Sequence, residues 1–190
     1  RRFKRTTQSQ HAWPIAPNRL AQDFTATAVN QKWLADITYI PTGEGWLYLA
    51  TVEDLFSRRI VGWSMGTTLT DHLTCQALRM ALARRHPPEG LIHHSDRGGQ
   101  YASANYTALL QAAKAVQSMS ATGNPYDNAP KESFFSRLKS ELLPDRPFDT
   151  RPQARSATFE YIEVFYNRQR LHSALGYRSP LEFEALHATP

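Results

Sequence analysis

Cysteine is almost absent from this chain, since Cys75 is the only one among 190 residues. A lone cysteine cannot form a disulfide within the chain, and it cannot build a zinc site that needs several thiolates. We therefore expect Cys75 to be a buried free thiol.

Long apolar runs are missing as well. No stretch approaches the ~20 residues that cross a bilayer. The polar, basic start of the chain also lacks the apolar segment of a secretory signal. These absences argue against a membrane protein and predict an intracellular one.

Acidic residues are missing from the first 22 positions, which hold the basic residues Arg1, Arg2, Lys4, Arg5 and Arg19. These five charges equal the net charge of +5 for the whole chain. Apolar residues show little periodicity before Asn30, and Pro14 and Pro17 interrupt any helix. The sequence predicts an extended basic arm or linker over residues 1–29. Such an arm suits a polyanionic partner, although a solvated tail would have the same composition.

Residues 30–190 have the apolar periodicity of a folded domain. Three short apolar segments in succession predict an antiparallel meander. In chain order, we expect strands at 32–40, 46–54 and 58–65, a helix between Thr70 and Pro87, a strand at 91–94, a helix at about 103–113 and a strand near Val116. A loop at 118–130 leads to a helix from about Asn128 to Leu143. After a Pro-rich break at 144–152, we expect a last long helix toward His172, with an apolar stripe of Phe159, Ile162, Phe165 and Tyr166. This order predicts an α/β domain with a mixed sheet of about five strands flanked by helices.

Three carboxylates occupy positions that need an explanation. Asp36 lies inside an apolar strand, where a buried charge is costly without a partner or a metal. Asp96 follows a short strand and precedes two glycines, a place where α/β folds often bind ligands. Glu132 lies near the start of a helix. Each has an ordinary alternative, namely a solvent-facing strand residue, a simple turn, and a first-turn acid favoured by the helix dipole.

Taken together, the three acids can converge on hard divalent cations, which prefer oxygen ligands. Two such ions about 4 Å apart can activate a water or a DNA 3'-hydroxyl and stabilise the leaving oxygen in an in-line displacement at phosphorus. The acids would repel one another in a site without a cation. We therefore treat all three as candidate metal ligands and catalytic residues.

Histidine and basic residues near these acids are further candidates. His93 and His94 are candidate partners of the metal ligands, although neighbouring strand residues face opposite ways and at most one can approach the site directly. Lys139 is the strongest candidate for a phosphate contact, because it shares a helix face with Glu132. The full set of candidate DNA contacts is Lys131, Arg137, Lys139, Arg168, Arg170 and His172. A charge run on a helix is more usually a solvated face.

Four segments carry a family resemblance: NQKWLADITYI at 30–40, HHSDRGGQYAS at 93–103, GNPYDNAPKESFFSRLKSE at 123–141 and YNRQRLHSALGYRSPLEF at 166–183. With these motifs, and with 35 residues between Asp96 and Glu132, the chain resembles the integrase-like transposases of bacterial insertion sequences, specifically the IS-three family. The resemblance implies a ribonuclease-H-like fold and an integrase-like catalytic core over 30–190 with a C-terminal helical extension. It assigns Asp36, Asp96 and Glu132 to the acidic triad.

The resemblance also implies cofactors and partners. Mg²⁺ is the expected cofactor, with Mn²⁺ as a substitute and two ions in the site. The expected reaction is cleavage of transposon ends and their joining to target DNA. A homo-oligomer on DNA is expected, in the bacterial cytoplasm at the nucleoid and not in a membrane.

Two departures and two alternatives accompany the resemblance. The segment SMSATGN at 118–124 lacks the basic residue that the family usually has near Ala121 or Thr122. The family's end-recognition and multimerising modules normally precede the core, so the arm over 1–29 is interpreted as their linker. A nuclease of the same fold that only hydrolyses nucleic acid stays open, as does a DNA-binding or assembly domain with a decayed site.

Overall fold

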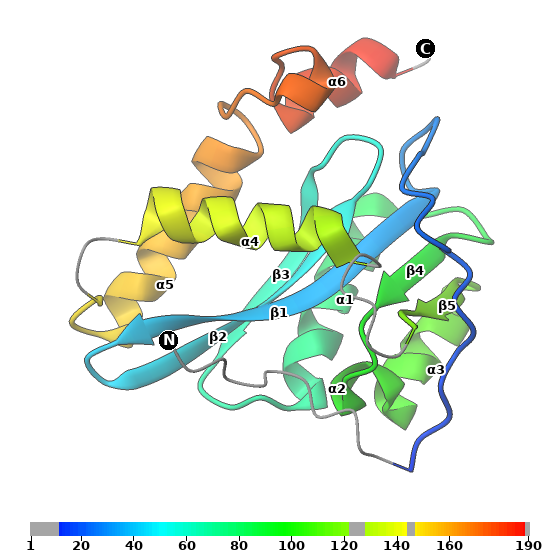
Figure 1. Cartoon of the computed structure of the whole chain (residues 1–190), viewed down its shortest axis with the longest axis horizontal. Helices are drawn as coiled ribbons and strands as arrows, with labels where there is room; N and C mark the ends of the chain where they lie inside the picture. Colours follow the sequence, from blue (N-terminus) through cyan, green and yellow to red (C-terminus); the bar gives the residue numbers. More distant parts are fainter. Residues whose placement is uncertain (1–11, 122–127, 144–146, 189–190) are drawn as a thin grey trace.

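The computed structural model describes residues 12–121, 128–143 and 147–188. They form a five-stranded mixed sheet in the order β3-β2-β1-β4-β5 (Figure 1). The strands are β1 (Lys32–Thr42), β2 (Gly45–Asp54), β3 (Ile60–Gly66), β4 (Ile92–Ser95) and β5 (Val116–Met119). The predicted α/β class and mixed five-stranded sheet are confirmed.

β1 is the central strand and takes part in two kinds of ladder. It runs antiparallel to β2, with Asp36 opposite Thr51, and β2 runs antiparallel to β3. This is the predicted meander. β1 also runs parallel to β4, with Ala35 opposite Ser95, and β4 runs parallel to β5. Because β4 ends at Ser95, the chain leaves the sheet beside Asp36.

Helices cover both faces of the sheet (Figure 1). They are α1 (Asp71–Arg85), α2 (Gly99–Ala102), α3 (Ala104–Ala112), α4 (Ala129–Leu142), α5 (Arg151–Glu160) and α6 (Pro180–His187). The first three cover one face, where Trp33 and Leu78 belong to a large apolar core that also buries Cys75 as predicted. α4 and α5 cover the other face around Ile40 and Phe134. No helix among residues 12–121, 128–143 and 147–188 is both long and apolar enough to cross a bilayer.

The end of the chain differs from the predicted single long helix. α5 continues as a π-helix over Tyr161–Tyr166, and a 3₁₀ turn and α6 follow. The Asn167 amide donates to the Ile162 carbonyl five residues earlier, at 3.1 Å, which is the π-helical spacing. The wider turn changes which residues face the core, so Phe159 is 50% exposed while Ile162 is buried. The predicted stripe is therefore wrong at Phe159, and also at Phe165, which is 39% exposed.

Other boundaries moved by a few residues. The helix predicted at 103–113 is preceded by the short helix α2, which the pattern did not indicate. The loop predicted at 118–130 begins later, because Ser118 and Met119 close β5. Its residues 122–127, and residues 144–146 of the predicted break, lie outside the described part of the chain.

The described part of the arm, residues 12–29, contains no helix or strand. Its later part packs on the domain. Leu20 is 2% exposed and clusters with Leu34 and Leu55. The Arg19 and Leu20 amides donate to Ser118 Oγ at 2.8 and 3.2 Å. Residue 20 is therefore part of the domain's packing, although the sequence predicts a separate arm there.

Candidate active site

Asp36 lies in the middle of β1, on the sheet face that α4 covers. Two donors hold its carboxylate. The Ile37 amide donates to Oδ1 at 2.7 Å, and Asn128 Nδ2 donates to Oδ2 at 3.0 Å. Asn128 is the N-cap residue of α4, as predicted, but its side chain does not cap the helix. It ties the start of α4 to Asp36 instead.

Asp96 is the first residue after β4. Since Ser95 pairs with Ala35, Asp96 follows beside Asp36 on the neighbouring strand. The Gly98 amide donates to Asp96 Oδ1 at 2.8 Å. A Cβ atom on residue 98 would lie 3.0 Å from the same oxygen, so glycine permits this close approach of backbone to carboxylate.

Glu132 lies in the first turn of α4, and its side chain is exposed. The electrostatics of Asp36 connect the three acids. Its pKa is raised to about 7, mainly by burial and next by the negative charge of Asp96, with a smaller contribution of the same sign from Glu132. The structure thus brings the three predicted acids within electrostatic reach of one another.

The chemistry of this donor set fits a divalent cation, because clustered carboxylates repel one another until a positive charge lies between them. Within the described residues, however, no three His, Cys, Asp or Glu side chains form a complete metal site. Asp36 and Asp96 directly follow Ala35 and Ser95, which lie opposite each other on β1 and β4, whereas Glu132 is exposed. Glu132 therefore has to turn toward the aspartates to complete the set.

Lys131 is not the DNA contact that the sequence predicts. It is fully buried, its Nζ donates to Thr51 Oγ1 at 2.9 Å, and it lies 3.4 Å from Glu53 Oε2. A buried ammonium with a carboxylate partner does not reach a phosphate in solvent, so this prediction is wrong. The Lys131 charge instead lies near Asp36, where it lowers the pKa of that carboxyl.

Lys139 lies on the side of α4 that faces the middle of β1. Its Nζ is 4.6 Å from the centroid of the Tyr39 ring. Burial lowers the pKa of Lys139, and the negative charge of Asp36 opposes that effect. These contacts put Lys139 near the acids, and its contact with DNA stays a prediction.

The other candidate DNA contacts have different surroundings. Arg168 is exposed. Arg170 pairs with Glu141 at 2.6 Å, so its charge already has a partner. His172 is buried, and its contact with DNA stays a prediction. Arg137 lines a pocket together with His172.

His93 and His94 are both buried and point to opposite faces of β4, as strand alternation predicts. His93 Nε2 lies 3.1 Å from the Tyr106 hydroxyl on the α3 side, whereas His94 Nδ1 lies 2.8 Å from Ser118 Oγ. Burial lowers the pKa of His93 to about 3, so this ring is neutral. Only His94 shares the sheet face of Asp36, and His93 is directed away from it.

Glu53 and Asn128 are neighbours of the site that sequence patterns did not single out for function. Glu53 is 1% exposed in β2 and pairs with Lys131. A signal for it was present, because Glu53, like Asp36, is a carboxylate within an apolar strand. The Asn128 contact depends on where α4 crosses β1, which no local pattern shows.

The arrangement defines a class of protein. An antiparallel meander joined to parallel strands, with acids on β1, after β4 and at the start of α4, is a ribonuclease-H-like catalytic core.

Comparison with known proteins gives the family. Two models, both described as integrase core domain, match residues 26–125 and 114–180. The chain is 50% identical over 184 residues to the transposase InsF for insertion sequence IS3A of Escherichia coli (strain K12), and 51% identical over 168 residues to the transposase for insertion sequence element IS904 of Lactococcus lactis. These matches cover 97% and 88% of this chain but 64% and 66% of the relatives, so the chain spans about two thirds of their length. The chain belongs to the integrase core domain family, as a member of the IS3 group of insertion-sequence transposases.

Solved structures agree on the fold. The intasome of simian T-cell lymphotropic virus, in complex with PP2A regulatory subunit B56 gamma, matches with a TM-score of 0.69 at 19% identity, over 98% of this chain and 62% of that chain. The HTLV-2 integrase catalytic core domain in complex with magnesium matches with a TM-score of 0.63 at 16% identity, over 84% of this chain and 99% of that chain. At such identities, the likeness establishes the ribonuclease-H-like fold alone.

Proposed function

We propose that this chain is the catalytic core of a DNA transposase that cleaves the ends of its element and joins them to target DNA. The observation that carries the proposal is that Asp96 and Glu132 lie near enough to Asp36, where α4 begins over the sheet, to raise the pKa of Asp36. The relatives at 50% and 51% identity, which are named transposases, support it.

Asp36, Asp96 and Glu132 are the residues that would hold Mg²⁺, or Mn²⁺ in its place, with two ions expected. Carboxylate oxygens are the ligands that these hard cations prefer. When bound, such ions polarise a phosphate and activate an attacking water or 3'-hydroxyl. The HTLV-2 integrase core in complex with magnesium supports the same choice of metal.

The protein's own groups position these acids. The Ile37 and Gly98 amides each fix one carboxylate oxygen, on Asp36 and Asp96 respectively. Asn128 fixes the second Asp36 oxygen and at the same time anchors the helix that carries Glu132. The orientation of the helix acid is thereby coupled to the strand acid.

Lys139 and the basic arm are the proposed contacts to DNA, which would bind as transposon end and as target. Lys139 lies on the acids' side of α4 and would contact a phosphate near the scissile bond. The arm over 1–29 would follow the phosphates, and such contacts carry little sequence information and weaken as salt rises. We also propose a homo-oligomer on DNA at the bacterial nucleoid. The HTLV-2 integrase core, which was solved in trimeric and dimeric forms, supports self-association.

A joining assay tests the proposal. The chain is incubated with Mg²⁺ or Mn²⁺, a labelled duplex of the element end with a free 3'-hydroxyl, and a supercoiled plasmid. We expect label to be joined to the plasmid. The substitutions Asp36→Asn, Asp96→Asn and Glu132→Gln keep side-chain size but remove a ligand charge, so each should abolish joining. Glu89→Gln is the matched control, because Glu89 is exposed on a loop that contacts Lys114.

The outcomes separate the alternatives. Plasmid nicking without joining indicates a nuclease that uses only water. DNA binding without any metal-dependent cutting by the wild type indicates a binding or assembly domain. Full activity in any one triad variant overturns the assignment of that acid.

A further inference from the structure

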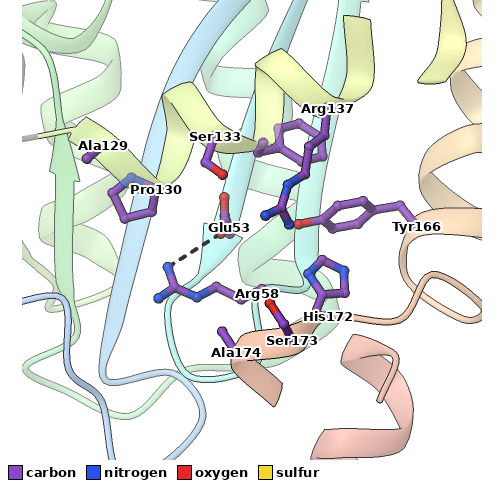
Figure 2. Close-up of a pocket in the computed structure, with 11 residues that line it drawn as sticks. Glu53, Arg58, Ala129, Pro130, Ser133, Arg137, Tyr166, His172, Ser173 and Ala174 are labelled. Atoms are coloured by element: carbon purple, nitrogen blue, oxygen red, sulfur yellow. Dashed lines mark ion pairs between the residues drawn. The ribbon is translucent and has the colours of Figure 1, made fainter. Parts of the chain in front are cut away.

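A pocket of about 310 Å³ lies at the flank of α4 that carries Ser133 and Arg137 (Figure 2). Its walls come from α4, from the end of β2 with the turn that follows, and from the segment 166–174. The residues that bring polar or aromatic groups to it are Glu53, Arg58, Ser133, Arg137, Tyr166 and His172. Ligand sites are typically concavities of about 300–1,000 Å³ with a few converging polar groups. The proposed reaction uses none of these six residues.

Two buried polar atoms at this pocket have no hydrogen-bond partner among the residues described. His172 is 3% exposed, and its Nε2 is unpaired. Glu53 is 1% exposed, and its Oε2 has only the Lys131 ammonium, 3.4 Å away, as an ionic neighbour. Buried polar atoms are nearly always paired. His172 Nε2 is therefore suited to a polar group brought in by a ligand, whereas Glu53 Oε2 already faces the Lys131 ammonium.

Two arginines add positive charge to the same pocket. Arg137 forms no ion pair with any carboxylate in the described ranges, and Arg58 comes no closer than 4.0 Å to Glu53 Oε1. Arg58 also has a φ of 62°, a left-handed conformation that is uncommon outside glycine and recurs at functional turns. Guanidinium groups suit phosphate oxygens. The pocket thus combines a buried acid, Arg58 in a long ion pair with that acid, and Arg137 without a carboxylate partner among the described residues.

The pocket and Glu132 share one helix. Ser133 and Arg137 are one turn apart on the flank next to Glu132. Figure 2 shows both side chains pointing from α4 toward the pocket. The pocket therefore lies one helix position away from the proposed metal ligand Glu132.

We propose that the pocket binds one unpaired nucleotide of the DNA substrate, with its base beside Glu53 and His172 and its phosphate at Arg58 and Arg137. The inference rests on the proposed function, because DNA is the ligand. A carboxylate accepts hydrogen bonds from the exocyclic amino groups of adenine, cytosine and guanine, whereas thymine has none. The Tyr166 ring, which lies edge-on to His172, gives the base an aromatic neighbour. A lone phosphate suits the pocket less well, since Glu53 would repel it.

Fluorescence binding tests the proposal with short duplexes that differ at one position. One duplex carries an unpaired 2-aminopurine, which has an exocyclic amino group, one carries an unpaired thymine, one an unpaired abasic residue, and one is fully paired. We expect the wild type to bind the aminopurine duplex about tenfold more tightly than the paired duplex. Thymine and the abasic residue should give little of this preference.

Two variants and two matched controls locate the effect. Ser133→Phe fills the mouth of the pocket, and Arg137→Gln removes a cation while keeping the shape of the helix flank. Both should lose the preference for the aminopurine duplex. Ser140→Phe is the control for the first, because Ser140 is exposed on α4 and does not line the pocket. Arg79→Gln is the control for the second, because Arg79 is exposed on α1, on the other face of the sheet. Both controls should keep the preference.

Three results would overturn the proposal: no preference in the wild type, an equal preference for the abasic duplex, or a full preference in both pocket variants. The second result would identify a phosphate site without base recognition. The joining assay in the same preparations separates this failure from failure of the proposed function. Metal-dependent joining without base preference leaves the transposase standing and removes the nucleotide pocket. Base preference without joining leaves the nucleotide pocket standing and removes the proposed transposase activity.

Discussion

Asp36→Asn should stabilise the metal-free fold, although it removes a proposed metal ligand. The structure supplies the reason. The pKa of the Asp36 carboxyl is raised from its ordinary value of 3.8 to about 7, mainly by burial and next by the negative charge of Asp96, with a smaller contribution from Glu132. Ionised Asp36 is therefore a cost to the native state whenever no cation is bound. An amide of the same shape carries no charge and avoids that cost.

The hydrogen bonds of the site accommodate the amide. The Ile37 amide can still donate to the side-chain oxygen of residue 36. The Asn128 side chain now donates to Asp36, and its own Oδ1 is buried without a partner. A half-turn of the Asn128 amide would present Oδ1 to the new NH₂ group. The half-turn exchanges the two Asn128 amide atoms, so the number of unpaired polar groups at the site does not rise.

The magnitude and sign follow from the pKa difference. Roughly 3 pKa units at 1.36 kcal/mol each set an upper limit of about 4 kcal/mol. Coupling among the acids and partial solvent access reduce this, and we expect about 1–3 kcal/mol near pH 8. Because the folded pKa lies above the unfolded value, wild-type stability from this group falls as pH rises from about 4 to about 7. The advantage of Asp36→Asn should grow over that window and then level off.

Thermal unfolding in chelator, between about pH 5 and pH 8, measures the effect. For a domain of this size, each 1 kcal/mol corresponds to about 2–4 °C in Tm. The control is Asp23→Asn, because the Lys32 and Thr25 side chains hold the pKa of Asp23 at about 2, so it is ionised throughout the window and should give no gain. A lower Tm for Asp36→Asn near pH 8, or a gain that does not change with pH, would refute the reasoning. Added Mg²⁺ should stabilise the wild type and narrow the difference, since a ligand of the native state stabilises it by mass action.

Three further predictions concern the surroundings of the acids. Lys139→Ala should weaken DNA binding evenly over sequences and lower the slope of log affinity against log salt concentration by about 1. Arg79→Ala on α1 should change neither the affinity nor the slope. Equal effects of the two substitutions in a salt series would exclude the phosphate contact of Lys139. Lys131→Met should lower the free energy of unfolding, measured in urea, by about 3–5 kcal/mol, because it leaves Glu53 buried without its cation. Adding Glu53→Gln should recover most of this loss. A double variant no more stable than the single one would contradict the pairing. Leu20→Ala should cost about 2–4 kcal/mol in the same assay, and an unchanged midpoint would show that the arm does not dock in solution.

Local patterns suffice for the elements that carry the acids. β1 and α4 are long and punctuated, with Pro41 near the end of the strand and Asn128 before the helix, and both match their predicted ranges within two residues. Asp36 and Asp96 could be predicted for the same reason. A carboxylate inside an apolar strand and a carboxylate just after a strand both stand out in the local sequence pattern. Their convergence needed the family resemblance, since register between β1 and β4 joins positions far apart in the sequence.

Lys131 and the last helix show where local patterns end. A lysine beside a glutamate near a helix start looks solvated, and its burial depends on Glu53, which lies on β2. The π-helix over Tyr161–Tyr166 likewise depends on packing, because Tyr166 inserts against Phe134 of α4 with ring centroids 4.8 Å apart. One extra residue in that turn reverses the exposure expected for Phe159.

The buried Lys131–Glu53 pair is best explained by the orientation of α4. A buried ion pair is weak evidence for stability, because apolar residues of similar volume often serve as well. In this helix, Lys131 faces the sheet, Glu132 is exposed beside the acids, and Ser133 lines the pocket. Rotating α4 by one residue, roughly 100°, would carry Lys131 away from Glu53 and leave that carboxylate buried alone. The pair therefore selects the rotation of α4 that puts Ser133 at the pocket and leaves Glu132 on the exposed side of the helix, from which it can turn toward Asp36 and Asp96. The stability lost by burying this charge pair thus sets the geometry of both proposed sites.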